Sequence, residues 1–315
     1  MRKILVTGGA GFIGSHIVEK LIKLKYKVSV YDDLSTGKYE YIQKYSKKIK
    51  FIKASITNIS HLKEATRNID CILHQAALRS VPKSIDNPLK FDRVNAQGAL
   101  NVLLAANYNK VKKVVFASSS SVYGIVKKLP ITENMPKNPI SPYSVSKLAG
   151  EYYCRLFSKK YKLPTVILRY FNVYGPRQPL ESKYAMAIPK FIACLLHGKQ
   201  PPIHDDGKQT RDFTYVDDIA TANILAMNKT GLNCDAFNIA SGKRYSVLEL
   251  VKILNKITNK DVKPVFLPHR VGDVRHTLAD ISKAKNILRY IPKGNFVKGL
   301  SETVKYYGGK AWKQS

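Results

Sequence analysis

The stretch TGGAGFIG, residues 7–14, directly follows the apolar run Ile4–Val6 and decides the fold. Its glycines at positions 9, 11 and 14 have the spacing G-x-G-x-x-G, and those at 8, 11 and 14 are evenly spaced. Glycine at such positions permits a tight strand-to-helix turn and lets backbone N–H groups approach a pyrophosphate. Apolar residues at helical spacing continue over residues 12–24, so the sequence predicts phosphate groups at a helix N-terminus.

A carboxylate follows at the distance that a dinucleotide-binding fold requires. Residues 27–31 have the pattern of a second strand, which ends at Asp32, about 20 residues beyond the glycines. A carboxylate there can bind the adenosine ribose hydroxyls and repels a ribose 2′-phosphate, which favours NAD over NADP. A glycine turn that binds no ligand is the alternative interpretation.

Strands and helices alternate along the first half of the chain. Strands are predicted at 49–53, 71–74, 113–117 and 163–169, and helices at 60–67 and 89–108. This order predicts an α/β fold, a Rossmann-type doubly wound parallel sheet, which binds its ligands at the carboxyl ends of the strands.

The second half has a less regular pattern. We expect a helix at 188–197, two βα-like units at 211–228 and 237–257, and a last helix at 297–307. Residues 1–171 are therefore expected to form a cofactor domain, to which residues 211–240 return. Residues 172–210 and 241–315 are expected to form a smaller C-terminal α/β domain that binds the substrate.

The composition is that of a soluble globular protein with an unusual charge. Lys+Arg number 53 against 22 Asp+Glu, a net charge of +31 that permits nucleic acid, an anionic surface or an acidic small molecule as partner. The lysines are scattered and accompany no zinc or RNA-binding motif, so we expect a solvated basic surface, no nucleic-acid partner and no metal.

Cysteine usage and hydropathy indicate the compartment. The four cysteines, at 71, 154, 194 and 234, form no C-x-x-C pair, which is typical of free thiols in a reducing compartment. The sequence shows no signal-peptide pattern and no apolar run long enough to cross a membrane. We therefore expect a cytoplasmic protein without a membrane partner.

A second motif is the Y-x-x-x-K pair of Tyr143 and Lys147, on a predicted helix that Ser141-Pro142 opens. A spacing of four puts both side chains on one helical face, one turn apart. An ammonium group so close favours the phenolate and lowers a pKa that starts near ~10, which makes Tyr143 a usable acid or base. Taken alone, the pair is more typical of an exposed face of an amphipathic helix.

In combination, these features resemble the extended short-chain dehydrogenase/reductase family over nearly the whole chain. They are the glycine loop, Asp32, a serine cluster that begins near Ser119, and the Y-x-x-x-K pair, in that order. The resemblance implies that Tyr143 transfers a proton, that Lys147 binds the nicotinamide ribose and tunes the tyrosine, and that Ser119 polarises the substrate oxygen. Ser120 and Ser121 are neighbours that could share the last role, and the implied catalytic set is Ser119, Ser120, Tyr143 and Lys147.

Further stretches are similar to nucleotide-sugar epimerases, and to UDP-N-acetylglucosamine 4-epimerases in particular. They are SSSVYG (119–124), RYFNVYGPRQ (169–178), YAMAIPK (184–190), TRDF (210–213) and RVGDVRH (270–276). The resemblance implies that Asn172 holds the diphosphate, that Arg211 and Arg270 bind phosphate oxygens, and that Asp273 binds the uridine ribose. Guanidinium groups suit phosphate oxygens, although either arginine alone could equally form a surface ion pair.

The resemblance also implies a complete set of binding residues. For the cofactor these are Gly8, Gly11, Phe12, Ile13, Gly14, Asp32, Asp33, Lys38, Ser55, Ile56, Gln75, Ala76, Ala77, Asn95, Ser118, Tyr143, Lys147 and Tyr170. For the substrate they are Ser119, Ser120, Ser121, Asn172, Ala187, Ile188, Ile203, His204, Arg211, Arg270, Asp273 and Thr277. Two positions depart from the family's pattern: Ser55 replaces an aspartate that binds adenine, and Arg79 stands where relatives have lysine or a small residue.

Thr277 lies four residues after Asp273, where the family lines the pocket for the sugar C2 substituent. A tyrosine there favours plain hexoses, and a small residue leaves space for an N-acetyl group. Thr277 therefore favours an N-acetylated substrate, and a simple packing residue is the alternative.

These implications combine into one expected function. The chain interconverts UDP-GlcNAc and UDP-GalNAc, with UDP-Glc and UDP-Gal as further substrates, through a transient 4-keto sugar and tightly bound NAD+/NADH. The alternatives are a UDP-glucose 4-epimerase, a UDP-glucuronate 4-epimerase, an NAD-binding regulator without catalysis, and a nucleic-acid-binding protein. By resemblance, the helices at 89–108 and around Tyr143 form the four-helix interface of a homodimer.

Overall fold

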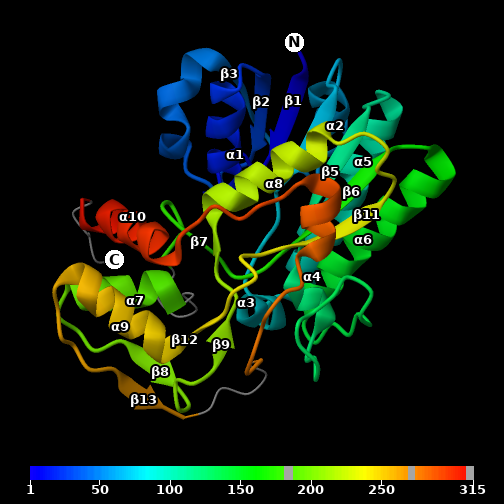
Figure 1. The fold of residues 1–315 in the computed structure, drawn as a ribbon. Helices are drawn as coiled ribbons and strands as arrows, with labels where there is room; N and C mark the ends of the chain where they lie inside the picture. Colours follow the sequence, from blue (N-terminus) through cyan, green and yellow to red (C-terminus); the bar gives the residue numbers. More distant parts are fainter. Residues whose placement is uncertain (181–186, 269–273, 310–315) are drawn as a thin grey trace.

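A computed structural model describes residues 1–180, 187–268 and 274–309. Within these residues, seven strands form one parallel sheet. Figure 1 shows this sheet in the upper part of the molecule. From one edge to the other, the strands are β11 (Asp235–Ile239), β6 (Thr165–Tyr170), β5 (Lys113–Ser119), β4 (Cys71–His74), β1 (Lys3–Thr7), β2 (Lys27–Asp32) and β3 (Ile49–Lys53). The order reverses between β1 and β4, which confirms the predicted doubly wound sheet.

Helices cover both faces of the sheet because its central strands are apolar on both sides. Ile4 and Val6 of β1 face a core with α1 (Phe12–Lys23) and α8 (Val216–Asn228), whereas Leu5 faces the opposite core. That second core includes α2 (Ile59–Ala65), α5 (Gly98–Tyr108) and α6 (Pro142–Tyr161).

A third hydrophobic core lies outside the sheet, at the lower left of Figure 1. It is built from α7 (Ala187–Leu196), α9 (Val247–Thr258) and α10 (Phe296–Gly308). Short strand pairs accompany these helices: β7 (Val173–Tyr174) with β10 (Thr214–Tyr215), β9 (Thr210–Arg211) with β12 (Tyr245–Ser246), and β8 (Pro202–His204) with β13 (Val265–Leu267).

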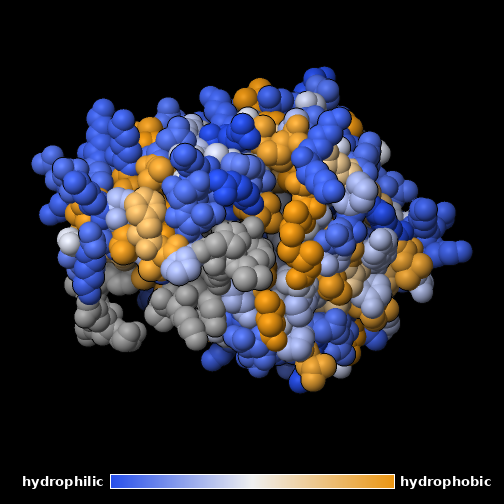
Figure 2. Space-filling view, turned by 90° about the horizontal axis from the view of Figure 1, so that it is seen from below, coloured by the Kyte–Doolittle hydropathy of each residue, from blue (hydrophilic) through white to orange (hydrophobic). Residues whose placement is uncertain are grey.

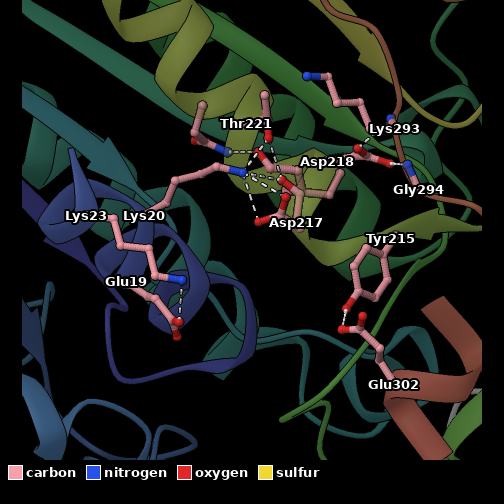
Figure 3. Close-up of polar contacts among 12 residues, drawn as sticks. Glu19, Lys20, Lys23, Tyr215, Asp217, Asp218, Thr221, Lys293, Gly294 and Glu302 are labelled. Carbon is pink, nitrogen blue, oxygen red and sulfur yellow. Dashed lines mark hydrogen bonds and ion pairs between the residues drawn. The ribbon is translucent and has the colours of Figure 1, made fainter. Parts of the chain in front are cut away.

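Polar contacts hold the later chain on the first part (Figure 3). Lys20 of α1 donates to both carboxylate oxygens of Asp217 at 2.8 Å and to the Thr221 hydroxyl at 2.6 Å, both on α8. The buried carboxylate of Asp218 accepts from the backbone N–H groups of Lys293 and Gly294 at 2.9 and 3.0 Å. The segment that leads into α10 is therefore fixed to α8, a helix that packs on the central sheet.

Most predicted elements occur within a few residues of their expected positions, and the region after β4 is the exception. The helix expected at 89–108 consists of α4 (Pro88–Phe91), a π-helical stretch Asp92–Gln97, and α5. A further helix, α3 (Val81–Asp86), precedes it and was not predicted. The polar residue Asn95 lies in the π-helical stretch, and its contacts are described below.

The surface mixes hydrophilic residues with separate hydrophobic patches, as one face shows in Figure 2. In the ranges that the structure describes, no helix combines the length and apolar character needed to cross a bilayer. In the same ranges, no group of three or more His, Cys, Asp and Glu side chains is arranged to hold a metal ion.

Candidate active site

The glycine turn lies between β1 and α1 and leaves no space for side chains. A Cβ atom on Gly14 would lie 2.0 Å from the Gly8 carbonyl oxygen, and one on Gly8 would lie 2.6 Å from the Ala76 nitrogen. Gly8 also has a φ of +69°, in the left-handed region that favours glycine. The backbone is thus packed closely at the start of α1, where N–H groups without helical partners favour an anion.

Thr7 and His74, the last residues of β1 and β4, form a hydrogen bond next to this turn. The Thr7 hydroxyl and His74 Nδ1 are 2.7 Å apart, and the Gln75 N–H donates to the Thr7 carbonyl at 3.0 Å. Burial, together with the positive charge of Lys147, lowers the pKa of His74 to about 3. The ring is therefore neutral at physiological pH and acts as a fixed hydrogen-bonding partner.

Asp32 ends β2 with its carboxylate held from both sides. One oxygen accepts from the Ala10 N–H and the other from the Leu34 N–H, each at 2.9 Å. Burial raises the pKa of Asp32, and these two bonds oppose that effect. Its side chain lines a groove at the carboxyl ends of the strands.

The groove brings together much of the predicted cofactor set, and the residues that line it fit the adenosine end of a dinucleotide. The predicted residues among them are Gly8, Asp32, Asp33, Ile56, Gln75, Ala76 and Ala77. Tyr31, Ser35, Thr36, Ala54, Leu78 and Val94 complete the lining and were not predicted. Added Cβ atoms at Gly8 and Gly14 would collide with backbone atoms, so the glycines keep the backbone of the turn close and accessible. A turn of this kind is suited to NAD.

Other predicted cofactor residues do not line the groove. The Ser55 hydroxyl accepts from the Thr57 hydroxyl at 3.1 Å, and the Lys38 side chain is exposed. The Ser118 hydroxyl donates to the buried carboxylate of Glu151 at 2.6 Å. A contact of Ser118 with the cofactor stays a prediction.

Asn95 fixes the wall of the groove. It accepts from the Leu78 N–H at 2.8 Å, and it donates to the Leu78 carbonyl at 3.0 Å and to the Ser146 hydroxyl at 3.1 Å. The π-helical stretch therefore joins the loop after β4 to α6.

Tyr143 and Lys147 lie near the start of α6, which begins at Pro142 because Ser141 and Ser144 form a capping box. The Tyr143 hydroxyl hydrogen-bonds with the Ser119 side chain. Ser119 Oγ itself accepts from Ser121 N and Oγ at 3.2 and 2.9 Å, which leaves its own hydrogen for the Tyr143 oxygen. Serine and phenol thus meet at the carboxyl end of β5.

Lys147 lies one helical turn after Tyr143 on α6, and its expected effect on the tyrosine stays a prediction. Burial raises the pKa of Tyr143, and the hydrogen bond from Ser119 and the charge of Arg79 oppose that rise. The ammonium group of Lys147 instead donates to the Ala117 carbonyl at 2.9 Å, and its burial lowers the pKa of Lys147 to about 8. The hydrogen bond from Ser119 and the charge of Arg79 both favour the phenolate of Tyr143.

Tyr170 closes a ring of hydrogen bonds with two amides. Its hydroxyl donates to Gln75 Oε1 at 3.1 Å and accepts from Asn223 Nδ2 at 2.7 Å, and Gln75 Nε2 donates to Asn223 Oδ1 at 3.0 Å. The ring links β6 and α8 to the groove residue Gln75.

Asn172 and Thr277 meet on the substrate side. Asn172 Nδ2 donates to the Asp212 carbonyl at 3.0 Å and to Thr277 Oγ1 at 3.2 Å. Thr277 Oγ1 also accepts from the Asp212 N–H at 3.3 Å. Arg211 donates to the carbonyl of Arg275 at 3.1 Å, whereas the predicted residues Arg270 and Asp273 lie outside the described residues.

The predicted substrate contacts near α7 and β8 are only partly available. Ile188 and Ile203 are 2% and 1% exposed, and they belong to the third core. Both side chains pack in this core, and a contact of either residue with the substrate stays a prediction. Ala187 is partly exposed, and His204 Nδ1 lies 3.0 Å from the Pro268 carbonyl.

The sequence patterns missed a buried ion pair behind the site. Arg169 of β6 and Glu151 of α6 are 0% and 1% exposed, and their closest atoms are 2.6 Å apart. Glu151 follows Lys147 by four residues, as Lys147 follows Tyr143, and that periodicity was the available signal.

Comparisons with known proteins agree with this geometry. The sequence profile of the NAD dependent epimerase/dehydratase family matches residues 4–240. A putative UDP-glucose 4-epimerase of Methanocaldococcus jannaschii is 40% identical over 306 residues, which cover 96% of this chain and 97% of that protein.

Solved structures show the same likeness. The UDP-N-acetylglucosamine 4-epimerase of Methanobrevibacter ruminantium, in complex with UDP-N-acetylmuramic acid, has a TM-score of 0.93 at 40% identity, and the match covers 97% of this chain and 98% of that one. The UDP-glucose 4-epimerase of Thermotoga maritima, with UDP-glucose, has a TM-score of 0.92 at 40% identity and the same coverage. The chain therefore belongs to the NAD-dependent epimerase/dehydratase family, in its branch of UDP-sugar 4-epimerases.

Proposed function

We propose that the chain is a UDP-N-acetylglucosamine 4-epimerase, which interconverts UDP-GlcNAc and UDP-GalNAc. The observation that carries this proposal is the hydrogen bond between Ser119 and Tyr143 at the carboxyl end of β5. A tyrosine whose oxygen accepts a hydrogen bond can, as the phenolate, take a proton from a sugar hydroxyl and return it.

The residues then have distinct roles. Tyr143, as the phenolate, takes the proton of the C4 hydroxyl. Ser120 holds the C4 oxygen in line with it, and Ser119 joins in when its hydrogen leaves the Tyr143 oxygen. NAD, when bound, would supply reversible hydride transfer at C4. The sugar turns over as a 4-keto form, and Tyr143 returns the proton to the oxygen in its new configuration.

Cofactor binding follows from the groove. The N–H groups at residues 11–14 would hold the pyrophosphate, and Asp32 would accept from the adenosine ribose hydroxyls and disfavour NADP. Lys147 would donate to the nicotinamide ribose. Release of about one NAD per chain from denatured protein supports this proposal, and a preference for NADP contradicts it.

On the substrate side, Asn172, Arg211, Arg270 and Asp273 would hold the UDP group. Both amide hydrogens of Asn172 are used within the protein, so binding a phosphate oxygen through this amide requires the release of one bond. Residues 172–210 and 241–315 would form the domain that carries the nucleotide sugar.

An N-acetylated substrate is favoured by the small Thr277, and the Methanobrevibacter ruminantium relative is solved with an N-acetylated UDP-sugar. UDP-glucose 4-epimerase is the second candidate, because relatives with that name are equally identical to this chain. Assays of the purified protein on UDP-GlcNAc, UDP-glucose and UDP-glucuronate separate these activities by their kcat/KM values. Higher kcat/KM on UDP-glucose than on UDP-GlcNAc contradicts our proposal.

Two variants test the site. Tyr143→Phe should lower kcat by about 10²–10⁴-fold, the usual contribution of a positioned acid or base, and should still bind NAD. Thr277→Tyr should lose UDP-GlcNAc turnover but keep UDP-glucose turnover if Thr277 lines the C2 pocket. Full N-acetyl turnover by Thr277→Tyr contradicts that assignment.

We further propose a homodimer through α5 and α6. Apolar side chains on these two packed helices are exposed in the single chain, namely Leu104, Tyr108, Val145, Tyr152 and Leu156. Light scattering should give twice the mass of the chain, and Leu156→Asp should give a monomer. A monomeric wild type contradicts the proposal.

A cytoplasmic location is also proposed. Cys71, Cys154, Cys194 and Cys234 are all free thiols, as expected in a reducing compartment. Fractionation of the source cells tests it directly.

A further inference from the structure

Three consecutive residues at the end of β5 each contact one residue of α6, and the three residues on α6 share one face. The Ala117 carbonyl accepts from Lys147, the Ser118 hydroxyl donates to Glu151, and the Ser119 side chain hydrogen-bonds with Tyr143. Two of these α6 residues belong to the proposed chemistry. Glu151 does not, because it is buried and its carboxylate binds Ser118 and Arg169.

Glu151 is held rigidly by an arginine on the neighbouring strand. Arg169 donates from Nε to one carboxylate oxygen at 2.8 Å and from a terminal nitrogen to the other at 2.6 Å. Its remaining terminal nitrogen donates to the Tyr123 hydroxyl at 2.8 Å and to the Glu133 carbonyl at 3.1 Å. The guanidinium therefore has partners on every side, and this two-point contact fixes the direction of the carboxylate.

The strand register connects this pair to the active site. Ser118 pairs with Arg169 across β5 and β6, and Ser119 pairs with Tyr170. Glu151 thus binds Ser118 on β5 and Arg169 on β6. These two residues directly precede Ser119 and Tyr170 on the adjacent strands. A buried ion pair is a weak source of stability, because apolar residues of the same volume often serve as well. A role in geometry explains its presence here better than a role in stability.

We propose that Glu151, held by Arg169, is a positioning residue that fixes the end of β5 against α6 through Ser118. This keeps the Ser119 hydroxyl in hydrogen-bond contact with Tyr143. The proposal rests on the proposed function in so far as the Ser119–Tyr143 contact serves proton transfer. The contact itself, however, can be tested without turnover.

Ser118→Ala is the decisive variant, because it removes the link to β5 and leaves the ion pair intact. We expect kcat to fall roughly tenfold, within the ~10²-fold that a misplacement of ~1 Å can cost, while KM changes by less than about twofold. The acid limb of the kcat–pH profile should move up by about 0.5 pH unit or more, because Tyr143 loses part of the bond that favours its phenolate. Ser118→Thr, which keeps the hydroxyl, should restore both values.

Two further measurements separate the possible outcomes. A crystal structure of Ser118→Ala should show the Ser119 and Tyr143 hydroxyls beyond hydrogen-bond distance, and the NAD content should match that of the wild type. The Glu151→Gln variant should give the same pH shift. If that variant does not fold, the Glu151→Leu/Arg169→Met double variant is measured in its place. A Ser118→Ala protein with wild-type kcat, pH profile and Ser119–Tyr143 distance overturns the proposal, whereas a wild type that turns over no UDP-sugar refutes only the proposed function.

Discussion

Replacement of Gly14 by alanine tests the glycine turn on which the cofactor groove depends. The added Cβ would lie 2.0 Å from the Gly8 carbonyl oxygen and 2.8 Å from the Gly9 Cα, whereas real Cβ contacts essentially never fall below 3.0 Å. Both neighbours are backbone atoms, so the start of α1 must move by about 1 Å away from the turn. Overpacking of this kind costs about 1–3 kcal/mol, which lowers Tm by roughly 2–10 °C in a chain of this size.

The same displacement should remove the cofactor. The N–H groups at the start of α1 lose their positions, and the stabilisation by bound NAD, about 2.7 kcal/mol at a hundred times its Kd, should largely disappear. Thermal denaturation with and without added NAD, together with the NAD released per chain, measures both effects.

Gly308→Ala is the matched control. A Cβ on Gly308, the last residue of α10, meets no atom within 4 Å, so Tm should stay the same or rise slightly. If Gly14→Ala denatures within 1 °C of the wild type and keeps its full response to NAD, the close packing of this turn does not hold the cofactor.

Three further predictions follow from individual side chains. Because burial lowers the pKa of Lys147 to about 8, its ammonium group is present below that pH and lost above it. The affinity for NAD, measured by calorimetry, should therefore fall as pH rises through 8. In Lys147→Arg the affinity should not fall over this range. Burial raises the pKa of Asp212 from 3.8 to about 6, so the folded state binds this proton more tightly than the unfolded state does. The stability that Asp212 contributes is therefore lost as pH rises from about 4 through 6. The Tm of Asp212→Asn relative to wild type should rise over that window, and a constant difference contradicts the assignment. Asn95→Leu leaves the N–H and carbonyl groups of Leu78 without their partner, which costs about 1–3 kcal/mol of folding stability. Urea denaturation should show this as a lower midpoint, and an unchanged midpoint means that Asn95 does not stabilise this loop.

The sequence predicts the features that depend on local patterns. The glycine turn and the position of Asp32 at the end of β2 follow from short-range spacing, because a strand, a tight turn and a helix leave few choices for these residues. The doubly wound parallel sheet could be predicted as well, because strands and helices alternate along the first half of the chain. These predictions are confirmed.

Features that depend on tertiary contacts could not be read from the sequence. The apolar spacing of residues 89–108 fits a continuous helix, and only the contacts of Asn95 with Leu78 and Ser146 distinguish the π-helical stretch. The spacing of Tyr143 and Lys147 likewise puts both on one helical face, but it does not show that the ammonium group binds the Ala117 carbonyl. Arg169 and Glu151 are far from each other in sequence, so their pairing depends on how α6 lies on β6.

The edge strand β11 consists of residues 235–239, although its neighbour β6 ends at residue 170. During synthesis, about three quarters of the polypeptide must leave the ribosome before the sheet gains its last strand. Until then, the hydrogen-bonding groups of β6 are open to pairing with other nascent chains. A fragment that stops at residue 171 should therefore aggregate, and any shortened version of this enzyme must retain the later strand.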